Sequence, residues 1–185
     1  MQGPNVRVDS ELSKKLENLI VDKRKSELII NLKKIDDKIS DIVSGTQSMI
    51  YVDIGAKRMI PANLMGDGFL KVLNIITNMN ETKNGIFLID EIDNGLHFST
   101  QKGLWKMILR GARETNTQIF LTTHSKECLF YLKELLEEEA FKNYQDEVKC
   151  FTISKLTDNT VKAYEYDFNS LEYAMEHDIE VRGEI

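Results

Sequence analysis

The stretch GIFLIDEIDNGLHFSTQ, residues 85–101, joins a run of apolar residues to two adjacent acids, Asp90 and Glu91. The apolar run predicts a buried strand over residues 86–90. A second apolar run, QIFLTTHS at residues 118–125, also ends in polar side chains, among them His124. If the two strands are neighbours in a parallel sheet, the acids and the histidine line one crevice, because ligands bind outside the carboxyl ends of such strands.

Helical and strand patterns alternate around these two runs. Apolar residues three and four apart predict helices after Gly66 and Gly68, from about Ser99 to Asn116, and after Ser125. The order strand, helix, strand, helix, strand over residues 86–154 predicts an α/β layer with parallel strands, and the fully apolar runs suit strands covered on both faces. Short antiparallel strands are expected in residues 38–62 and 148–167, with a last helix near 171–175.

The N-terminal segment has a different character. Residues 9–35 are rich in Lys, Glu and Leu and contain neither Gly nor Pro. Leu12, Leu16, Leu19 and Ile20 mark one face, which predicts one long amphipathic helix that forms an arm.

Composition sets limits on the class of protein. The chain has 185 residues, 42% of them hydrophobic, with 24 Lys and Arg against 30 Asp and Glu. That size suits one globular domain or a large piece of one. The net charge of −6 gives no general electrostatic reason to bind nucleic acid, although a local basic patch can still do so.

Compartment follows from what the sequence lacks. It has no apolar run of the length that spans a membrane and no signal peptide, so we expect a cytoplasmic protein that does not contact a membrane. Cys128 and Cys150 show no CxxC spacing, which favours two buried thiols in a reducing compartment.

The paired acids suggest a chemistry. Adjacent residues at a strand end point in different directions, so one of the two carboxylates can hold Mg²⁺ while the other faces an attacking water. Hydrolysis of a nucleoside triphosphate requires this division of roles. The alternative is that an acid merely ends a strand and caps the following helix. Three further features lie around the acids: DNGLH directly after them, His124 after the next strand, and the glycine-rich turn MGDG before them.

In this order and spacing, LMGDGFLKVL, GIFLIDEIDNGLHFSTQKGLWKMI and QIFLTTHSKEC resemble the C-terminal half of bacterial AAA/ABC-type ATPases of the OLD-like group. YVDIGAKRMIPANLMGDG and the final DIEVR are similar in style. The resemblance covers residues 38–185. It implies part of an ABC-type P-loop core with parallel central strands, preceded by a helical arm over residues 1–37.

The resemblance also implies roles for individual residues. Asp90 resembles the Walker B aspartate associated with Mg²⁺, Glu91 the glutamate that polarises the attacking water, and His124 the switch histidine that senses the terminal phosphate of ATP. The remaining correspondences are with the signature turn, at Gly66, Asp67 and Gly68, and with the D-loop, at Asn94 and Gly95. His97 stands where transporter-type relatives usually have Asp.

The phosphate-binding half of such a site is missing. None of the ten glycines opens a GxxxxGK[ST] sequence, and no Q-loop is identifiable. Either the N-terminal lobe lies upstream of Met1, or a separate polypeptide supplies it, or the domain has lost nucleotide binding. On the first two views, ATP and Mg²⁺ are bound only in the completed ATPase. We expect a homodimer, contact with nucleic acid through the full assembly, and an exposed edge or apolar face where the lobe docks.

Two other classes of function compete with this one. Asp90, Glu91, Asp93 and His124 could form the metal site of a nuclease or phosphoesterase, since clustered carboxylates bind Mg²⁺ or Mn²⁺. Asp93 belongs to a turn, however, and no second acidic cluster completes a two-metal site. The chain could also be a non-catalytic interaction module in which the motifs are relics, with Trp105 and its helix serving only in packing.

Overall fold

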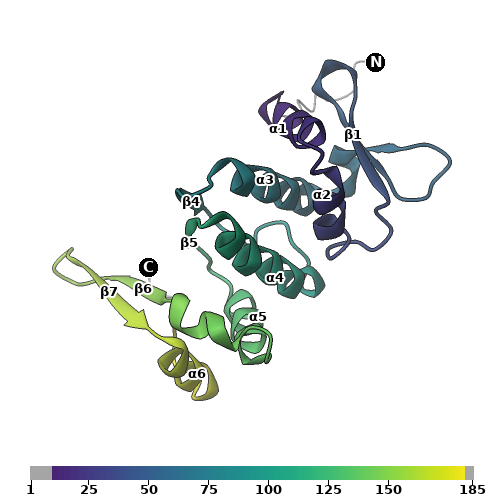
Figure 1. Cartoon of the computed structure of the whole chain (residues 1–185). Coiled ribbons are helices and arrows are strands. Elements are labelled where there is room, and N and C mark those ends of the chain that lie inside the picture. Colours follow the sequence, from purple (N-terminus) through teal and green to yellow (C-terminus); the bar gives the residue numbers. More distant parts are fainter. Residues whose placement is uncertain (1–9, 182–185) are drawn as a thin grey trace. The chain divides into compact units, whose positions relative to one another are not determined.

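The protein is described by a computed structural model of residues 10–181, without the side chain of Ser99. It divides into two compact units (Figure 1). The first unit comprises residues 1–89 and 94–120, and the second comprises residues 90–93 and 121–185. Arg182, at the end of DIEVR, and the outer limits of the predicted arm and ATPase segment lie outside the described residues. Between residues 10 and 181, no helix combines the length and apolar character needed to cross a bilayer.

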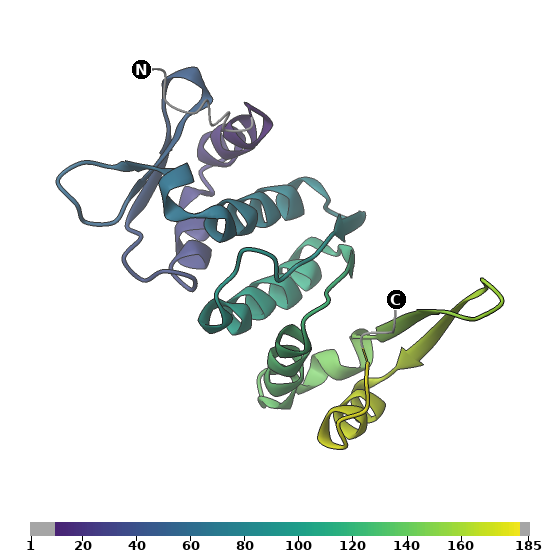
Figure 2. The same ribbon diagram turned by 180° about the vertical axis from the view of Figure 1, so that it is seen from behind.

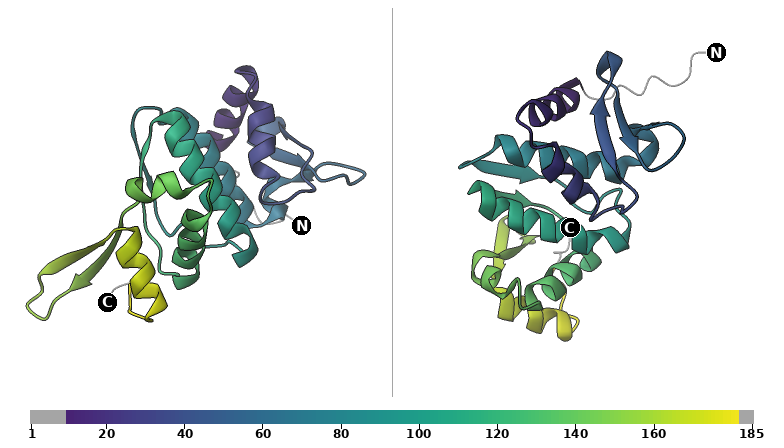
Figure 3. Two further views of the ribbon diagram at one scale, coloured as in Figure 1. Left: turned by 60° about the horizontal axis from the view of Figure 1, so that its bottom comes forward. Right: turned by 45° about the vertical axis from the view of Figure 1, so that its right-hand side comes forward.

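The predicted long N-terminal helix is wrong in one respect, because two helices form in its place: α1 (Ser10–Val21) and α2 (Lys25–Leu32). The break is a left-handed turn at Lys23, whose φ is 59°. The Arg24 N–H reaches back to Leu19 O (2.9 Å) and the Lys23 N–H to Ile20 O (3.1 Å), the pattern of a Schellman helix end. The apolar faces are buried, and both helices contact α3 (Figure 3).

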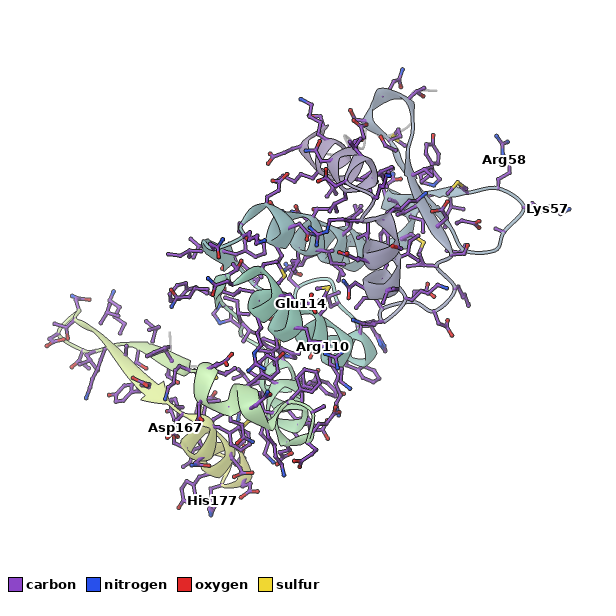
Figure 4. The ribbon with its side chains drawn as sticks, viewed as in Figure 1. Lys57, Arg58, Arg110, Glu114, Asp167 and His177 are labelled. Carbon is purple, nitrogen blue, oxygen red and sulfur yellow. The ribbon has the colours of Figure 1, made fainter. Side chains whose placement is uncertain are left out.

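The predicted antiparallel strands form a three-stranded sheet. It contains β1 (Asp41–Ser44), β2 (Ile50–Asp53) and β3 (Ile60–Pro61), in that order. Ile42 pairs with Val52 in the register, and both side chains are buried. The loop between β2 and β3 carries the exposed side chains of Lys57 and Arg58 away from the sheet (Figure 4).

Two long helices form the centre of the first unit. α3 (Asp67–Glu81) follows Gly66, its N-cap residue, and buries one face, including Phe69, Val72 and Ile76. α4 (Phe98–Thr115) packs against it and buries Leu104, Trp105, Met107 and Ile108. Trp105 and its neighbours therefore pack in the core, as the sequence predicts.

The strands β4 (Ile86–Ile89) and β5 (Gln118–Leu121) pair with each other. The expectation that they are covered on both faces is wrong. Successive strand residues point to opposite faces, and one face is exposed: Ile86 by 60%, Leu88 by 71% and Phe120 by 51%. We call these three side chains the β4–β5 apolar face. Their exposure agrees with the expectation of an exposed apolar face.

The second unit contains α5 (Lys126–Glu137), the antiparallel strands β6 (Cys150–Lys155) and β7 (Val161–Tyr166), and α6 (Phe168–Glu176). Ser125 caps α5 as predicted, and Asp167 caps α6 by accepting from the Ser170 N–H at 2.9 Å. The hairpin extends beyond α6 (Figure 2). β6 was predicted to join the parallel layer, but its pairing within the described residues is with β7 alone.

The prediction of two buried thiols holds for Cys128 and in part for Cys150. Cys128 is buried, and Cys150 is half-buried at the base of the hairpin. Burial raises the pKa of the Cys150 thiol to about 11. Since the thiolate is the reactive form, the Cys150 thiol is not a candidate nucleophile.

The contrast between exposed and buried leucines gives a stability test. Leu88→Lys should change the free energy of unfolding by less than about 1 kcal/mol, because the side chain already contacts solvent. Leu104→Ala should cost about 2–5 kcal/mol, since Leu104 is fully buried. Urea denaturation followed by circular dichroism measures both. A loss at Leu88→Lys as large as that at Leu104→Ala would show that β4 is covered by the chain itself.

Candidate functional site

The two strands that carry the acids and the histidine run in the same direction. The Gln118 N–H donates to Gly85 O (2.9 Å) at their start, and the Ile92 N–H donates to Thr122 O (2.9 Å) just beyond their end. Residue numbers therefore increase together along the pair. Parallel pairing places the acids and residues 122–124 at the same, carboxyl edge of the sheet.

The paired acids are held by a threonine of the neighbouring strand end. The Thr122 hydroxyl donates to Asp90 Oδ1 (2.5 Å) and accepts from the Glu91 N–H (2.9 Å). Both acid residues are exposed. Glu91 has a φ of 46°, an unfavourable region for a residue with a side chain and one that is concentrated at functional sites.

A second threonine holds the third acid. The Thr123 hydroxyl donates to Asp93 Oδ1 (2.5 Å) and accepts from the Ser125 N–H (3.1 Å). His124 is the next residue, and its side chain is exposed. It directly precedes Ser125, the N-cap of α5. Asp90, Glu91, Asp93, Thr122 and Thr123 thus form one hydrogen-bonded group within the second unit, and His124 follows it in the sequence. We call it the acid–threonine group.

The predicted signature turn and D-loop meet in the first unit. Gly66 has a φ of 93° and Gly95 a φ of 76°, conformations that favour glycine. Gly68 is buried against Gly95: a Cβ at position 68 would lie 2.3 Å from Gly95 O. Asp67 also lies close, with its Cβ 3.5 Å from a Cβ built on Gly95, while Asn94 is exposed. The structure thus brings these two predicted segments into backbone contact.

The side chains at the acid edge suit a Mg²⁺ ion held mostly by a nucleotide. Across residues 10–181, no group of three or more His, Cys, Asp or Glu side chains could hold a metal ion. Mg²⁺ in phosphate-transfer sites is commonly bound through one or two carboxylates, with substrate oxygens and waters as the other ligands. Asp90 fits that arrangement, because Thr122 occupies one of its oxygens and the other remains for a metal or its water. A metal-only nuclease centre would require more protein ligands.

The two threonines are the functional candidates that the sequence reasoning did not assign. They belong to the polar strand end TTHS, which the sequence identified for its histidine. The signal that could have found them is position, since two hydroxyl residues end a strand beside one that ends in acids. Which hydroxyl bonds to which acid depends on the register of the strands.

Comparison with known proteins agrees with the fold. Residues 5–129 match the profile of a family described as AAA domain, putative AbiEii toxin, Type IV TA system. An ATP/GTP phosphatase of Helicobacter pylori is 30% identical over 161 residues, which are 85% of this chain and 42% of that protein. An uncharacterized protein of Methanocaldococcus jannaschii is 35% identical over 78 residues, 42% of this chain and 68% of that protein. The chain thus spans less than half the length of the Helicobacter pylori relative.

Solved structures give the same architecture. A chain from work on ATP-driven dimerization and DNA-stimulated activation of SMC ATPases superposes with a TM-score of 0.59 and 12% identity, over 90% of this chain and 98% of that one. The Smc head domain with coiled coil and joint of Pyrococcus yayanosii gives a TM-score of 0.58 and 14% identity, over 92% of this chain and 32% of that one. At these identities the likeness shows the fold, a mixed α/β core of the kind found in SMC ATPase heads.

The glycine contact can be tested by adding one methyl group. Gly68→Ala should lower the free energy of unfolding by about 1–3 kcal/mol, because the new Cβ meets the Gly95 backbone, which cannot turn aside. Gly111→Ala is the matched control, since its Cβ meets only the flexible end of Met79 and alanine favours the helix by about 1 kcal/mol. Chemical denaturation compares them. Equal stabilities of the two variants would contradict the backbone contact.

Proposed function

This chain belongs to the family of AAA domains described as putative AbiEii toxin, Type IV TA system, and we propose that it is the C-terminal portion of an OLD-like, ABC-type ATPase. In this role it supplies the signature turn, the Walker B acids and the switch histidine for ATP hydrolysis, in the cytoplasm. The observation that carries the proposal is the acid–threonine group: Asp90 and Glu91 are hydrogen-bonded to the strand end that continues into His124.

The proposed roles are those that the resemblance implies, and the hydrogen bonds of that group support them. Asp90 would hold Mg²⁺ directly or through water, and the ion would offset negative charge on the phosphates. Glu91 is exposed, so its carboxylate can orient a water and take up its proton as the water oxygen attacks the terminal phosphorus. His124 contacts the oxygens of that phosphate. Gly66, Asp67 and Gly68 present helix N–H groups, which attract phosphate oxygens, and Asn94 and Gly95 lie beside them.

On this proposal, a partner lobe supplies the positive charge that binds the phosphates of ATP. The sequence contains no GxxxxGK[ST], so a Walker A loop of another segment or another polypeptide completes the site. The β4–β5 apolar face supports this, because three large apolar side chains of these strands remain in solvent. Residues 1–37 then form the arm that returns from the missing lobe, and residues 38–185 the C-terminal part of the core.

A homodimer of the completed ATPase is part of the same proposal. In ABC-type dimers, one subunit's signature turn closes on the nucleotide held by the other subunit's Walker A loop. The packing of Gly68 on Gly95 holds the backbone of the proposed signature turn against that of the proposed D-loop. The structural neighbour with a TM-score of 0.59 comes from work on the ATP-driven dimerization of SMC ATPases.

Nucleic acid is proposed as a partner of the full assembly only. The chain as a whole is acidic, but Lys57 and Arg58 are exposed at the end of the loop between β2 and β3 (Figure 4). Cations presented on such a loop can contact phosphate groups, and binding of this kind weakens as the salt concentration rises. The work that describes the same structural neighbour concerns activation of SMC ATPases by DNA.

The first test is nucleotide binding by calorimetry. This chain alone should bind ATP and Mg²⁺ weakly or not at all. Affinity and hydrolysis should appear when it is combined with the Walker A-bearing polypeptide that we expect to be encoded immediately upstream or in a neighbouring gene. Glu91→Gln in the combined sample should lower kcat by roughly 100-fold or more while ATP remains bound.

The controls separate the competing functions. Thr160→Val, in the turn of the β6–β7 hairpin, should leave hydrolysis unchanged. If the combined sample does not hydrolyse ATP, the ATPase proposal fails. If the chain alone cuts DNA and Asp90→Ala abolishes cutting, the nuclease alternative replaces it.

The second test concerns the docking surface. Leu88→Lys should prevent the Walker A polypeptide from binding, because it places a charge in an apolar interface, while the chain itself remains folded. Phe151→Lys is the matched control, since Phe151 is an exposed apolar strand residue of the hairpin. Co-purification and analytical ultracentrifugation report binding. Retained binding by Leu88→Lys would place the interface elsewhere.

A further inference from the structure

We propose that Thr122 is a positioning residue of the ATPase site, whose hydroxyl fixes Asp90 and Glu91 together. The inference rests on the proposed function, because it concerns the two acids that the ATPase requires. It assigns their placement to the neighbouring strand end rather than to their own loop.

One side chain makes two hydrogen bonds whose directions are fixed by chemistry. A hydroxyl has a single hydrogen to donate and lone pairs that accept. The Glu91 N–H can only donate, so Thr122 Oγ1 accepts from it, at 2.9 Å. The Thr122 hydrogen is then free to go to Asp90 Oδ1, at 2.5 Å. The ionised carboxylate of Asp90 is the stronger type of acceptor, which favours this arrangement.

The main chain of Thr122 adds a third bond. Its carbonyl oxygen accepts from the Ile92 N–H at 2.9 Å, and Ile92 is fully buried. Thr122 therefore holds three consecutive residues, 90, 91 and 92, from the position directly after β5. The buried Ile92 anchors one end of this segment, and the threonine hydroxyl sets the exposed end, which carries the acids.

These bonds explain how Glu91 keeps a left-handed backbone. A φ of 46° costs a residue with a side chain about 1 kcal/mol or more, and such a conformation persists only where its surroundings determine it. Bonds to the N–H groups of Glu91 and Ile92 lie on both sides of the Glu91 α-carbon. Losing the first of them lets residue 91 relax toward an ordinary conformation and changes where its carboxylate points.

The bond to Asp90 has a consequence for metal binding. Because Thr122 occupies Oδ1, the carboxylate presents its other oxygen to the metal or to a metal-bound water. Thr122 thereby selects one oxygen and one orientation. Without the hydroxyl, the exposed carboxylate rotates among orientations, and binding Mg²⁺ must first restrict it.

The chain provides a rescue variant and a matched control. Thr122→Val removes the hydroxyl and keeps the branched shape, whereas Thr122→Ser keeps the hydroxyl. Thr160→Val is the control, because the Thr160 hydroxyl also donates to an aspartate, Asp158, at 2.6 Å in the hairpin turn. That pair lies in the second unit, as Thr122 does, but outside the acid–threonine group.

The first measurement uses the chain alone and does not depend on ATP. Amide hydrogen exchange followed by NMR should show the Glu91 N–H exchanging about three- to tenfold faster in Thr122→Val, the size expected for one lost hydrogen bond. Thr122→Ser and Thr160→Val should exchange as the wild type does. An unchanged rate in Thr122→Val would overturn the proposal whatever the ATPase does.

The second measurement uses the assembled ATPase. Thr122→Val should raise the Mg²⁺ concentration for half-maximal hydrolysis several-fold and lower kcat, with a much smaller change in the KM for ATP, and Thr122→Ser should restore both. Unchanged Mg²⁺ dependence and kcat would show that the hydroxyl is only structural. If the wild-type assembly shows no hydrolysis, the proposed function fails, and the positioning role fails with it.

Discussion

The parallel pairing of β4 with β5 is the constraint on which the rest of the structure depends. Two hydrogen bonds fix it, from Gln118 to Gly85 at one end and from Ile92 to Thr122 at the other. With this register, two acids meet two threonines, and the histidine follows at the same edge. A shift by one residue would turn every side chain of β5 to the opposite face and break both threonine–aspartate bonds.

The same pair of strands leaves one apolar face exposed to solvent. Its carboxyl edge carries polar groups in a defined arrangement, yet one of its faces leaves Ile86, Leu88 and Phe120 in solvent. An apolar face of this kind beside a functional edge fits a surface that a partner covers. The acids also favour a partner. Binding of a triphosphate beside Asp90 and Glu91 requires positive charge, and the sequence contains no Walker A loop to supply it. Apolar surface and charge both favour completion by one additional lobe.

Much of this could be predicted from the sequence, and the failures have physical reasons. The helices and strands from β1 to α6 follow the apolar spacing closely, and the cap at Ser125 was recognisable. The helix break at Lys23 was not, because a Schellman turn there uses neither Gly nor Pro. Burial of both faces of β4 and β5 was predicted wrongly, since one face is exposed. The sequences IFLI and IFL are equally apolar whether their own chain or a partner covers them. The threonine bonds depend on strand register, which a single sequence does not specify.

The most direct test of the account is an experimental structure of the chain assembled with its Walker A lobe, Mg²⁺ and a non-hydrolysable ATP analogue. The account predicts that Asp90 contacts the ion or its water through the oxygen not bonded to Thr122, that His124 faces the terminal phosphate, and that the lobe covers Leu88. A nucleotide bound away from the acid–threonine group, or a lobe that leaves β4 and β5 in solvent, would contradict it.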